Sequence, residues 1–420
     1  MVTPVWPASR APNGIATYTS YMAPAFRNEG VRPVLLAWDT GEKTNGNVAV
    51  VPDDLVDISR FKPGRTLLGR ASAKAQHLLA GAGLGDPRFS MLAGAVRGAL
   101  ARFPIEILEI EEAFGLAGRI VRLKRVPVVT RLHGPWFLNG RTSNEPIDAA
   151  YHQRVRRERQ SIELADAVTS PSQDVLDRTR EFYRLPLEEA RVIPCPIETR
   201  SDDRLWNLAD ADPNRILFAG RFDLHKGGDL MIDAFIALAK SRPSLSLDFV
   251  GPDRGLSDPS GRLIHLGEYL QSRVPDAQIA RRIVIHGQKK LDEVDDFRRR
   301  ALITVVPSRY ETFGYTAVEA LRLGCPVVAT TAGGLGEIVR DGQTGLCFRP
   351  GDSEALARQV DRLLGDLQLA ARLGQAGRLD VARRYSPTAI AESTLDLYAS
   401  VVERWSSKSR ARGGQSSPIA

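Results

Sequence analysis

The stretch from Val305 to Gly351 reads VVPSRYETFGYTAVEALRLGCPVVATTAGGLGEIVRDGQTGLCFRPG. A buried-type strand ends at Pro307, and a helix with an apolar face ends at Gly324. A second strand follows Pro326, and a glycine pair then opens another short helix. This alternation is typical of a parallel sheet, whose ligand loops lie at the carboxyl ends of its strands. The stretch therefore predicts an α/β fold with two neighbouring ligand loops.

Two carboxylates lie at the first of these loops. Glu311 and Glu319 flank the start of the first helix, and Gly333 and Gly334 open the second. Helix N-termini favour anions, because their free N–H groups and the helix dipole both attract negative charge. Two acids beside a phosphate-binding position indicate a sugar nucleotide, with hydroxyls facing the acids and a diphosphate facing the helix start.

Glu311 and Glu319, eight positions apart around Phe313 and Gly314, resemble the E-x7-E motif of retaining GT-B glycosyltransferases of family 4 (group 1 type). The similarity continues through ATTAGGLGEIVRDGQTG, is strong over residues 215–352 and is weak over 35–125. It implies an α/β GT-B fold, in which two Rossmann-like domains with parallel sheets face each other across a cleft. A C-terminal helix then crosses back to the N-terminal domain.

Length and composition agree with this fold class. A chain of 420 residues with 43% hydrophobic and 25% charged residues is long enough for two globular domains. The polar run over 201–214 has the composition of a linker. The predicted units are an acceptor-binding domain over 1–200, a nucleotide-sugar-binding domain over 201–385, a crossover helix over 386–405 and a disordered tail over 406–420.

The resemblance also assigns roles to residues. Arg221 and Lys226, in the strand-to-helix turn GRFDLHKGG, would hold the nucleotide diphosphate, and His133, at a strand end, would face the donor sugar. Glu311 would hold the sugar's hydroxyls, although a nucleophilic role is an alternative, and Glu319 would accept hydrogen bonds from the ribose. The predicted catalytic residues are Glu311, Arg221, Lys226 and His133. The predicted donor-binding residues are Glu319, Gly314, Phe313, Gly333, Gly334, Leu335, Gly14 and Gly287.

Each of these assignments has a structural alternative. An isolated histidine is more often structural than functional, Gly14 fits an ordinary turn, and Arg221 and Lys226 fit solvated surface charges. No Asp-x-Asp motif lies beside the loops, and the three cysteines show no pairing or zinc-binding spacing. We therefore expect no metal, no cofactor and no disulfide, with a UDP- or GDP-linked sugar as the donor substrate.

The function that the resemblance implies is hexosyl transfer, with retention at the anomeric carbon, from an NDP-sugar to an acceptor hydroxyl. The acceptor would be a sugar, a lipid-linked molecule or a small molecule, in polysaccharide, glycolipid or glycoconjugate biosynthesis. The alternatives are a phosphorylase or nucleotide-sugar epimerase of the same fold, or a catalytically silent sugar-nucleotide-binding scaffold. A nucleic-acid partner is not expected, because the net charge of +7 is dispersed along the chain.

The N-terminal part of the chain carries two further hypotheses. Residues 61–103 are rich in Lys and Arg and contain two helical patterns, which fit either a peripheral contact with an anionic membrane or ordinary solvated helix faces. Residues 1–4 read as the end of a strand, which suggests that the natural start lies upstream. With no signal-peptide pattern and no apolar run near ~18 residues, we expect a cytoplasmic protein, with membrane contact at most at the inner face.

Overall fold

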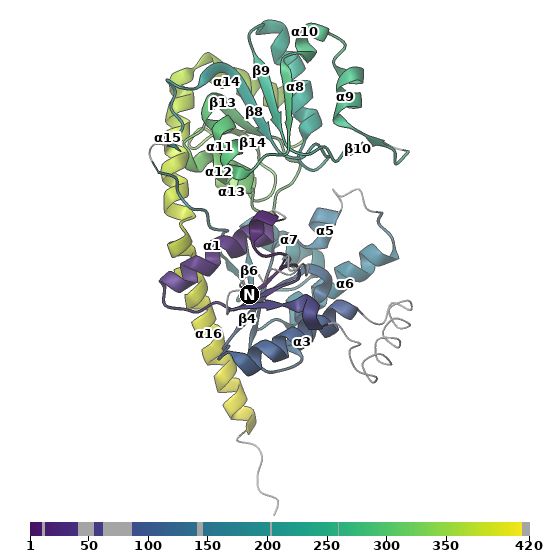
Figure 1. Ribbon diagram of the computed structural model, residues 1–420, viewed down its shortest axis with the longest axis vertical. Helices are drawn as coiled ribbons and strands as arrows, with labels where there is room; N and C mark the ends of the chain where they lie inside the picture. Colours follow the sequence, from purple (N-terminus) through teal and green to yellow (C-terminus); the bar gives the residue numbers. More distant parts are fainter. Residues whose placement is uncertain are drawn as a thin grey trace, which may run out of the picture.

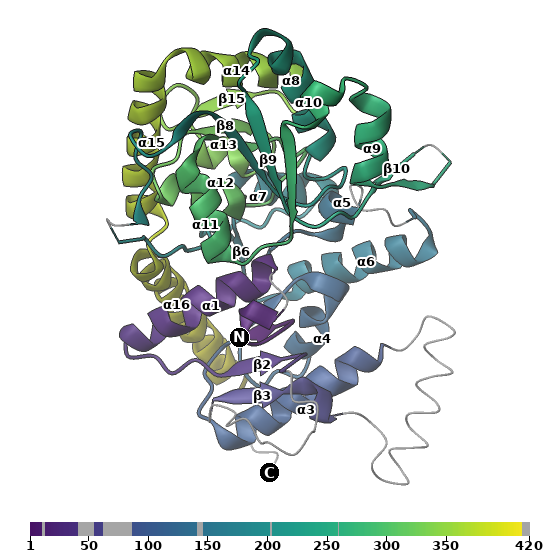
Figure 2. The ribbon, with the colours of Figure 1, turned by 45° about the horizontal axis from the view of Figure 1, so that its top comes forward.

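The computed structural model describes residues 1–10, 13–40, 54–61, 86–140, 146–201, 204–258 and 260–413. Two α/β domains are stacked along the long axis of the molecule, the first in purple and blue and the second in teal and green (Figure 1). The last helix, in yellow, runs from the second domain along the first, and a turned view shows the same arrangement (Figure 2). The predicted two-domain fold with a helix crossing back is confirmed.

The first domain contains two adjoining parallel sheets, ordered β1-β2-β3 and β4-β5-β6-β7, in which β1 lies beside β4. The strands are β1 Val2–Thr3, β2 Leu35–Ala37, β3 Leu55–Asp57, β4 Leu108–Glu111, β5 Val128–Arg131, β6 Ala167–Ser170 and β7 Arg191–Val192. The helices are η1 Ala8–Arg10, α1 Gly14–Asn28, η2 Ile58–Phe61, α3 Pro87–Arg102, η3 Ala113–Gly115, α4 Ala117–Val121, α5 Trp136–Asn139, α6 Ala149–Leu164 and α7 Gln173–Tyr183.

The second domain is built on a six-stranded parallel sheet with the order β12-β9-β8-β13-β14-β15, and carries a small antiparallel hairpin, β10-β11. The strands are β8 Asp212–Ala219, β9 Ser246–Val250, β10 Leu256–Ser257, β11 Leu263–Ile264, β12 Ile283–Gly287, β13 Ala301–Val306, β14 Val327–Thr330 and β15 Leu346–Phe348. The helices are α8 Gly228–Ser241, α9 Leu266–Arg273, α10 Ala277–Ala280, α11 Leu291–Arg300, α12 Tyr315–Arg322, α13 Leu335–Ile338, α14 Ser353–Gly365, α15 Leu367–Arg384 and α16 Pro387–Gly413.

Both domains reverse their strand order next to the first strand. Counted within the second domain, its sheet runs 3-2-1-4-5-6 and reverses between β8 and β13, and the first domain reverses between β1 and β4. In doubly wound sheets, ligands bind at the carboxyl ends of the strands beside this reversal. The topology therefore places one ligand crevice in each domain.

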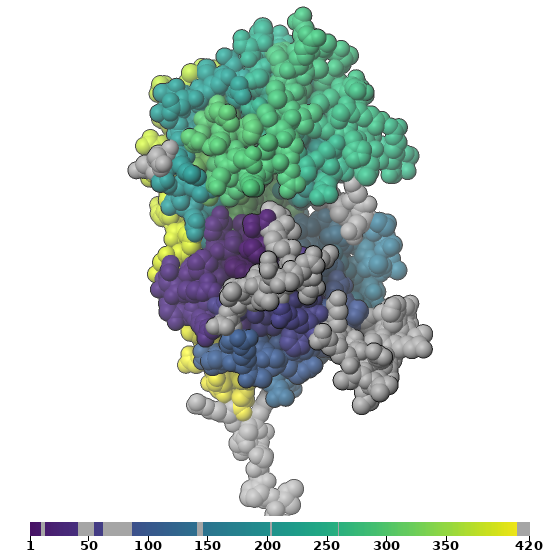
Figure 3. Space-filling view, viewed as in Figure 1, coloured from purple at the N-terminus to yellow at the C-terminus, as the bar shows by residue number. Residues whose placement is uncertain are grey.

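A shared apolar cluster joins the two domains. Phe26 of α1 and Phe313 of the second domain belong to one buried cluster with Tyr398 of α16. The Tyr398 hydroxyl donates to the carboxylate of Glu109 in the first domain at 2.6 Å. Where the chain crosses between domains, the Ile197 N–H donates to the Tyr385 carbonyl at 2.8 Å. The two segments that pass between the domains, one at Ile197 and one at Tyr385, therefore lie side by side. Figure 3 shows the domains in contact, with the yellow helix along one edge.

The structure corrects two predictions about irregular segments. The predicted linker is anchored, because the Trp206 N–H donates to Leu323 O at 2.8 Å and its indole N–H to Ala301 O at 2.9 Å. Its last residues, from Asp212 onward, already belong to β8. The tail predicted to be disordered over 406–420 is helical as far as Gly413, because α16 continues into it, and residues 414–420 lie outside the described residues.

The basic segment over 61–103 is described only in part. Its C-terminal helical pattern forms α3, which Asp86 caps by accepting the Arg88 N–H at 3.0 Å. Residues 62–85 lie outside the described residues, and the membrane contact stays a prediction. Within the described part of the chain, no helix has the length and apolar character needed to cross a bilayer.

Candidate functional site

A cavity of about 810 Å³ lies between the two domains, at the strand ends where both sheets reverse their order. The first domain contributes Pro4, Asn13, Gly14, Ile15, Glu112, Ala113, His133, Gly134, Trp136, Asn139, Arg154, Pro171 and Cys195. The second contributes Arg221, Asp223, His225, Lys226, Arg254, Glu311, Thr312, Phe313, Gly314, Tyr315 and Thr316. Seven of the predicted site residues line it: Gly14, His133, Arg221, Lys226, Glu311, Phe313 and Gly314.

The charged pair in the second domain joins the loops after β8 and β13. Lys226 precedes α8, and its Nζ lies 2.5 Å from Glu311 Oε1. The Ser308 hydroxyl donates to the same oxygen at 2.8 Å. Burial pushes the pKa of Glu311 upward, but the neighbouring charges of Lys226 and His225 outweigh it, and the net pKa is lowered. Glu311 is therefore held as a carboxylate inside the cavity.

The second cation of the site is linked to the first through one aspartate. Arg221 donates from Nε to Asp223 Oδ2 at 2.6 Å, and the Lys226 N–H donates to Asp223 Oδ1 at 2.7 Å. A third cation, Arg254, lines the same cavity and was not singled out from the sequence. Arg254 could have been identified from the sequence by its place in the GPDRG loop after β9, since this loop also lies at the carboxyl end of a parallel strand.

The glycine pair supports the Glu311 loop through close backbone contact. Gly333 has a φ of +62°, and a Cβ there would lie 2.1 Å from Glu311 O. The Gly334 N–H donates to Glu311 O at 2.8 Å, and Leu335 is fully buried. None of the three residues is among those that line the cavity. The helix α13 has only four residues, so its dipole is small. A direct donor contact at these positions stays a prediction.

On the opposite side, His133 is fixed from both ends of its backbone. Its N–H donates to Glu112 Oε2 at 3.0 Å, and the Gly134 N–H donates to Glu112 Oε1 at 2.8 Å. The Thr312 hydroxyl, from the second domain, donates to His133 O at 2.8 Å. Glu112 was not predicted from the sequence, and the one feature that could have identified it is its place directly after the buried strand β4, at the end of the acidic run EIEE. Glu112 acts on the site through the position of His133.

The two titratable groups of this loop are both shifted toward their neutral forms. Burial, and secondarily the charge of Arg131, lowers the pKa of His133 well below its ordinary value. Burial and the neighbouring Glu158 raise the pKa of Glu112 to about 8. His133 is therefore neutral at physiological pH, and can exchange hydrogen bonds with a sugar hydroxyl without adding charge.

A cationic and aromatic wall closes the first-domain side of the cavity. The fully buried Glu158 accepts the Trp136 N–H at 2.6 Å and the Arg154 Nε–H at 2.9 Å. The Arg154 guanidinium lies 3.7 Å from the centre of the Trp136 ring. Arg154 and Trp136 both line the cavity, and neither was predicted from the sequence. They present an apolar face and a positive charge to the cavity.

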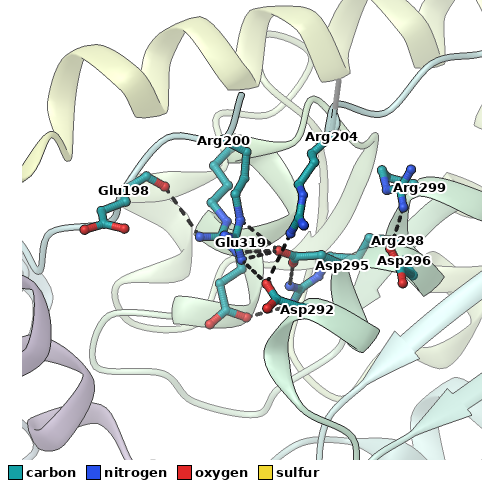
Figure 4. A network of polar contacts seen from close by, with 10 residues as sticks. Glu198, Arg200, Arg204, Asp292, Asp295, Asp296, Arg298, Arg299 and Glu319 are labelled. Carbon is teal, nitrogen blue, oxygen red and sulfur yellow. Dashed lines mark hydrogen bonds and ion pairs between the residues drawn. The ribbon is translucent and has the colours of Figure 1, made fainter. Parts of the chain in front are cut away.

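Two further predicted donor-binding residues, Glu319 and Gly287, are also absent from the cavity lining. Glu319 lies farther along α12 and accepts a hydrogen bond from Arg298 at 2.7 Å (Figure 4). Gly287 ends β12, has a φ of +67° and accepts the Gly251 N–H at 2.9 Å. No atom of a described residue would lie within 4 Å of a Cβ at Gly287. Their contacts with the ribose and the base stay predictions.

Polar contacts also hold the two domains together beside the cavity. The Ser172 hydroxyl donates to Thr312 O at 2.8 Å. Glu337 of α13 accepts the backbone N–H groups of Gln173 and Asp174, at 3.0 Å and 2.9 Å, where α7 begins. A carboxylate at a helix N-terminus is favoured by the helix dipole. The relative position of the two halves of the cavity is thus fixed by direct contacts.

Among the described residues, no group of three or more His, Cys, Asp or Glu side chains is arranged to hold a metal ion. All three cysteines are free and buried.

The fold and the cavity define a protein of the GT-B class. The structure resembles that of sucrose-phosphate synthase from Thermosynechococcus elongatus, with a TM-score of 0.70 and 23% identity over 96% of this chain and 98% of that one. It also resembles HepE of Anabaena, solved in complex with UDP, with a TM-score of 0.66 and 17% identity over 95% of this chain and 99% of that one. At these identities the likeness shows the fold.

The family follows from sequence models. The model for Glycosyltransferase Family 4 matches residues 12–201, and that for Glycosyl transferases group 1 matches residues 200–380. The chain belongs to the group 1, family 4 glycosyltransferases. One curated relative is the D-inositol 3-phosphate glycosyltransferase of Streptomyces bingchenggensis, 30% identical over 284 residues. That match covers 66% of this chain and 62% of the relative.

Proposed function

We propose that this protein transfers a hexosyl group, with retention of anomeric configuration, from a nucleoside diphosphate sugar to an acceptor hydroxyl. The observation that carries the proposal is the Lys226–Glu311 pair beside Arg221, at the strand reversal of the second domain. Cations for a diphosphate and a carboxylate for sugar hydroxyls meet there in one cavity. The donor would occupy the second-domain side, and the acceptor the side of His133 and Trp136.

Lys226 and Arg221 would stabilise the departing diphosphate. Each is already held in place by a carboxylate, Glu311 for Lys226 and Asp223 for Arg221. Preorganised cations aimed at developing negative charge are among the largest contributions to catalysis. We therefore expect Lys226→Ala or Arg221→Ala to lower kcat on the order of 10²-fold or more.

Glu311 would bind the sugar rather than attack it. Its Oε1 is already engaged by Lys226 Nζ and the Ser308 hydroxyl, and these contacts withdraw electron density from the carboxylate. Its Oε2 is then the acceptor for a donor sugar hydroxyl. Retention would follow if the acceptor oxygen bonds to the anomeric carbon on the face from which the diphosphate leaves. In that step the bond between the anomeric carbon and the phosphate oxygen breaks, and the phosphate oxygen takes the proton of the acceptor hydroxyl.

The positive charge on the acceptor side of the cavity favours an anionic acceptor. The Streptomyces bingchenggensis relative is a D-inositol 3-phosphate glycosyltransferase. Here Arg154 lines the cavity with 22% of its side chain exposed, next to the ring of Trp136. We infer that an acceptor carrying a phosphate is used better than its unphosphorylated counterpart, and parallel assays of matched acceptor pairs test this.

A thermal-shift screen of UDP, GDP, ADP and CMP, with and without Mg²⁺, tests the donor site first. A ligand that binds only the folded state raises Tm by mass action. We expect one diphosphate to raise Tm in the wild type and in Lys240→Ala, and to do so much less in Lys226→Ala. Lys240 is an exposed lysine at the other end of α8 and serves as the matched control. No shift with any nucleotide would favour the scaffold alternative.

Activity assays with the sugars of that nucleotide test the chemistry. We expect turnover to persist in EDTA, and a strict Mg²⁺ requirement would overturn metal independence. The anomeric proton coupling of the product, read by NMR, reports retention or inversion. Turnover with phosphate and no nucleotide would indicate a phosphorylase, and conversion of the donor without an acceptor would indicate an epimerase.

A further inference from the structure

A buried ionic cluster surrounds Glu319. It consists of Arg200 from the interdomain segment, Asp295 and Arg298 from α11, and Glu319 and Arg322 from α12, and is called here the Asp295 cluster (Figure 4). The side chains of Arg298 and Arg322 are each 1% exposed. Burying cations at this depth is unfavourable unless each is paired with good geometry. The contacts of each member therefore decide what the cluster does.

Asp295 is the centre of the cluster. Its Oδ2 accepts hydrogen bonds from Arg322 at 2.7 Å and from Arg200 at 2.9 Å, and its Oδ1 accepts one from Arg298 at 2.9 Å. One carboxylate therefore fixes three guanidinium groups. Because the Arg298 guanidinium is planar and presents several donors in fixed directions, one bond to Asp295 also sets the direction of its remaining N–H groups.

Another N–H group of Arg298 points toward Glu319. Its Nη2 donates to Glu319 Oε2 at 2.7 Å, while Oε1 makes no hydrogen bond to a described residue. Glu319 belongs to α12, and Tyr315 and Thr316 at the start of the same helix line the cavity. With 17% of its side chain exposed, Glu319 has one oxygen fixed and one available to a ligand.

We propose that Arg298 is a positioning residue for the ribose of the donor: held by Asp295, it fixes Glu319 Oε2 so that Oε1 accepts a hydrogen bond from a ribose hydroxyl. This inference rests on the proposed function, and adds a residue that does not itself touch the substrate. It also gives α11 a role in the site, because Asp295 and Arg298 both lie on this helix. The chemistry that the cluster recognises is a vicinal diol on the nucleotide.

The chain contains a matched control for Arg298. Arg322 is equally buried and also donates to Asp295, and no described residue accepts a hydrogen bond from the Nε of either arginine. Only Arg298 contacts Glu319; Arg322 instead makes its second contact with Glu198 O at 3.4 Å. Replacing either arginine by lysine keeps the charge and shortens the side chain, so the two variants carry similar structural costs. They differ in whether Glu319 loses its anchor.

The test is isothermal titration of UDP and of its 2′-deoxy and 3′-deoxy analogues, or the guanosine series if GDP is selected in the screen. The wild type is expected to prefer the ribonucleotide over at least one analogue by roughly tenfold or more, as for a hydrogen bond to a charged group. Arg298→Lys should reduce this preference to within about threefold, whereas Arg322→Lys should retain it. In turnover assays, Arg298→Lys should raise the donor KM with little change in kcat, because Arg298 does not touch the reacting atoms.

Glu319→Asp keeps the test decisive if Arg298→Lys does not fold. The shorter carboxylate cannot reach both Arg298 and the ribose, and the preference should fall in the same way. An unchanged preference in Arg298→Lys, an equal loss in both arginine variants, or no preference in the wild type would overturn the inference while leaving nucleotide binding intact. If the wild type bound no nucleotide at all, the proposed function would fall, and this inference with it.

Discussion

Removing Lys226 is expected to reverse the sign of the pH dependence that Glu311 contributes to stability. In the wild type the pKa of Glu311 is lowered, because Lys226 and His225 outweigh the effect of burial. Lys226→Ala leaves the carboxylate buried, with the Ser308 hydroxyl as its remaining short contact at this oxygen. Burial then dominates, and the pKa of Glu311 should rise above its value in the unfolded chain.

The loss of folding stability in Lys226→Ala depends on how exposed Lys226 and Glu311 are. Breaking a fully buried ion pair costs about 3–5 kcal/mol, but here 20% of the Lys226 side chain and 11% of the Glu311 side chain are exposed. Water can partly replace the ammonium, so we expect about 1–3 kcal/mol at pH 7. A group with a lowered folded pKa stabilises the fold above its unfolded pKa of about 4.3, and one with a raised folded pKa destabilises it there. The cost of Lys226→Ala should therefore be small below about pH 4 and grow toward pH 7.

The assay is urea unfolding of the wild type, Lys226→Ala, Glu311→Gln and the double variant, at pH 4 and pH 7, with Lys240→Ala as the control. In the Glu311→Gln background, Lys226→Ala should cost little at either pH, because no carboxylate is left unpaired. A cost of Lys226→Ala that is equal at both pH values, or that persists in the Glu311→Gln background, would refute the reasoning. The lysine would then act through packing rather than through the charge of Glu311.

Two further predictions concern residues that support the loops. Gly333→Ala should lower turnover by more than tenfold, because its Cβ would lie 2.1 Å from Glu311 O. Gly342 has a similar φ of +68°, but a Cβ there would meet no described atom, so Gly342→Ala should show the effect of backbone strain alone. Equal effects of the two variants on turnover would contradict the role of the close contact. Glu112→Gln should lower turnover by roughly tenfold, since a donor NH2 group replaces one of the two oxygens that accept the loop N–H groups. Because the wild-type pKa of Glu112 is raised to about 8, the unfolded chain loses this proton first, and the wild type loses stability as pH rises from about 4.3 toward 8. The stability of Glu112→Gln relative to the wild type should therefore improve from pH 6 to pH 9, and a constant difference in unfolding midpoint would argue against this ionisation.

The sequence predicted the elements and the edge on which the ligand loops lie. Hydrophobic runs broken by Pro and Gly mark the strands and helices of the second domain, and parallel topology then places Lys226 and Glu311 at the same sheet edge. The linker was predicted poorly, because its polar composition hides one residue, Trp206, whose indole anchors it to the second domain. The disordered tail was predicted poorly as well, since Ser, Lys and Arg are compatible with continuing a helix that tertiary contacts have already nucleated.

Contacts between side chains far apart in the chain were not predictable in the same way. The spacing of Glu311 and Glu319 suggests two equivalent acids, yet Glu311 meets Lys226 and Glu319 meets Arg298. Arg298 lies in the run DEVDDFRRR, where three consecutive arginines look alike in the sequence. Only the packing of α11 against α12 selects the one that is buried. Helical periodicity predicts which face a residue occupies, but not which long side chain reaches across to a neighbouring helix.

The buried glutamates in the two halves of the cavity have different hydrogen-bond and charge partners, and this difference is consistent with the substrates proposed for each half. Glu311 is paired with an ammonium and stays charged, so it adds a negative charge next to the cations Lys226, Arg221 and Arg254. Glu112 accepts two backbone N–H groups, but burial and the neighbouring Glu158 outweigh them, so its pKa is raised to about 8 and it is largely neutral at physiological pH. An anionic donor therefore encounters three cations and two carboxylates, Glu311 and Asp223, in the second-domain lining of the cavity. Because one positive charge remains on the donor side, we expect the diphosphate to bind there without a metal ion and activity to persist in EDTA.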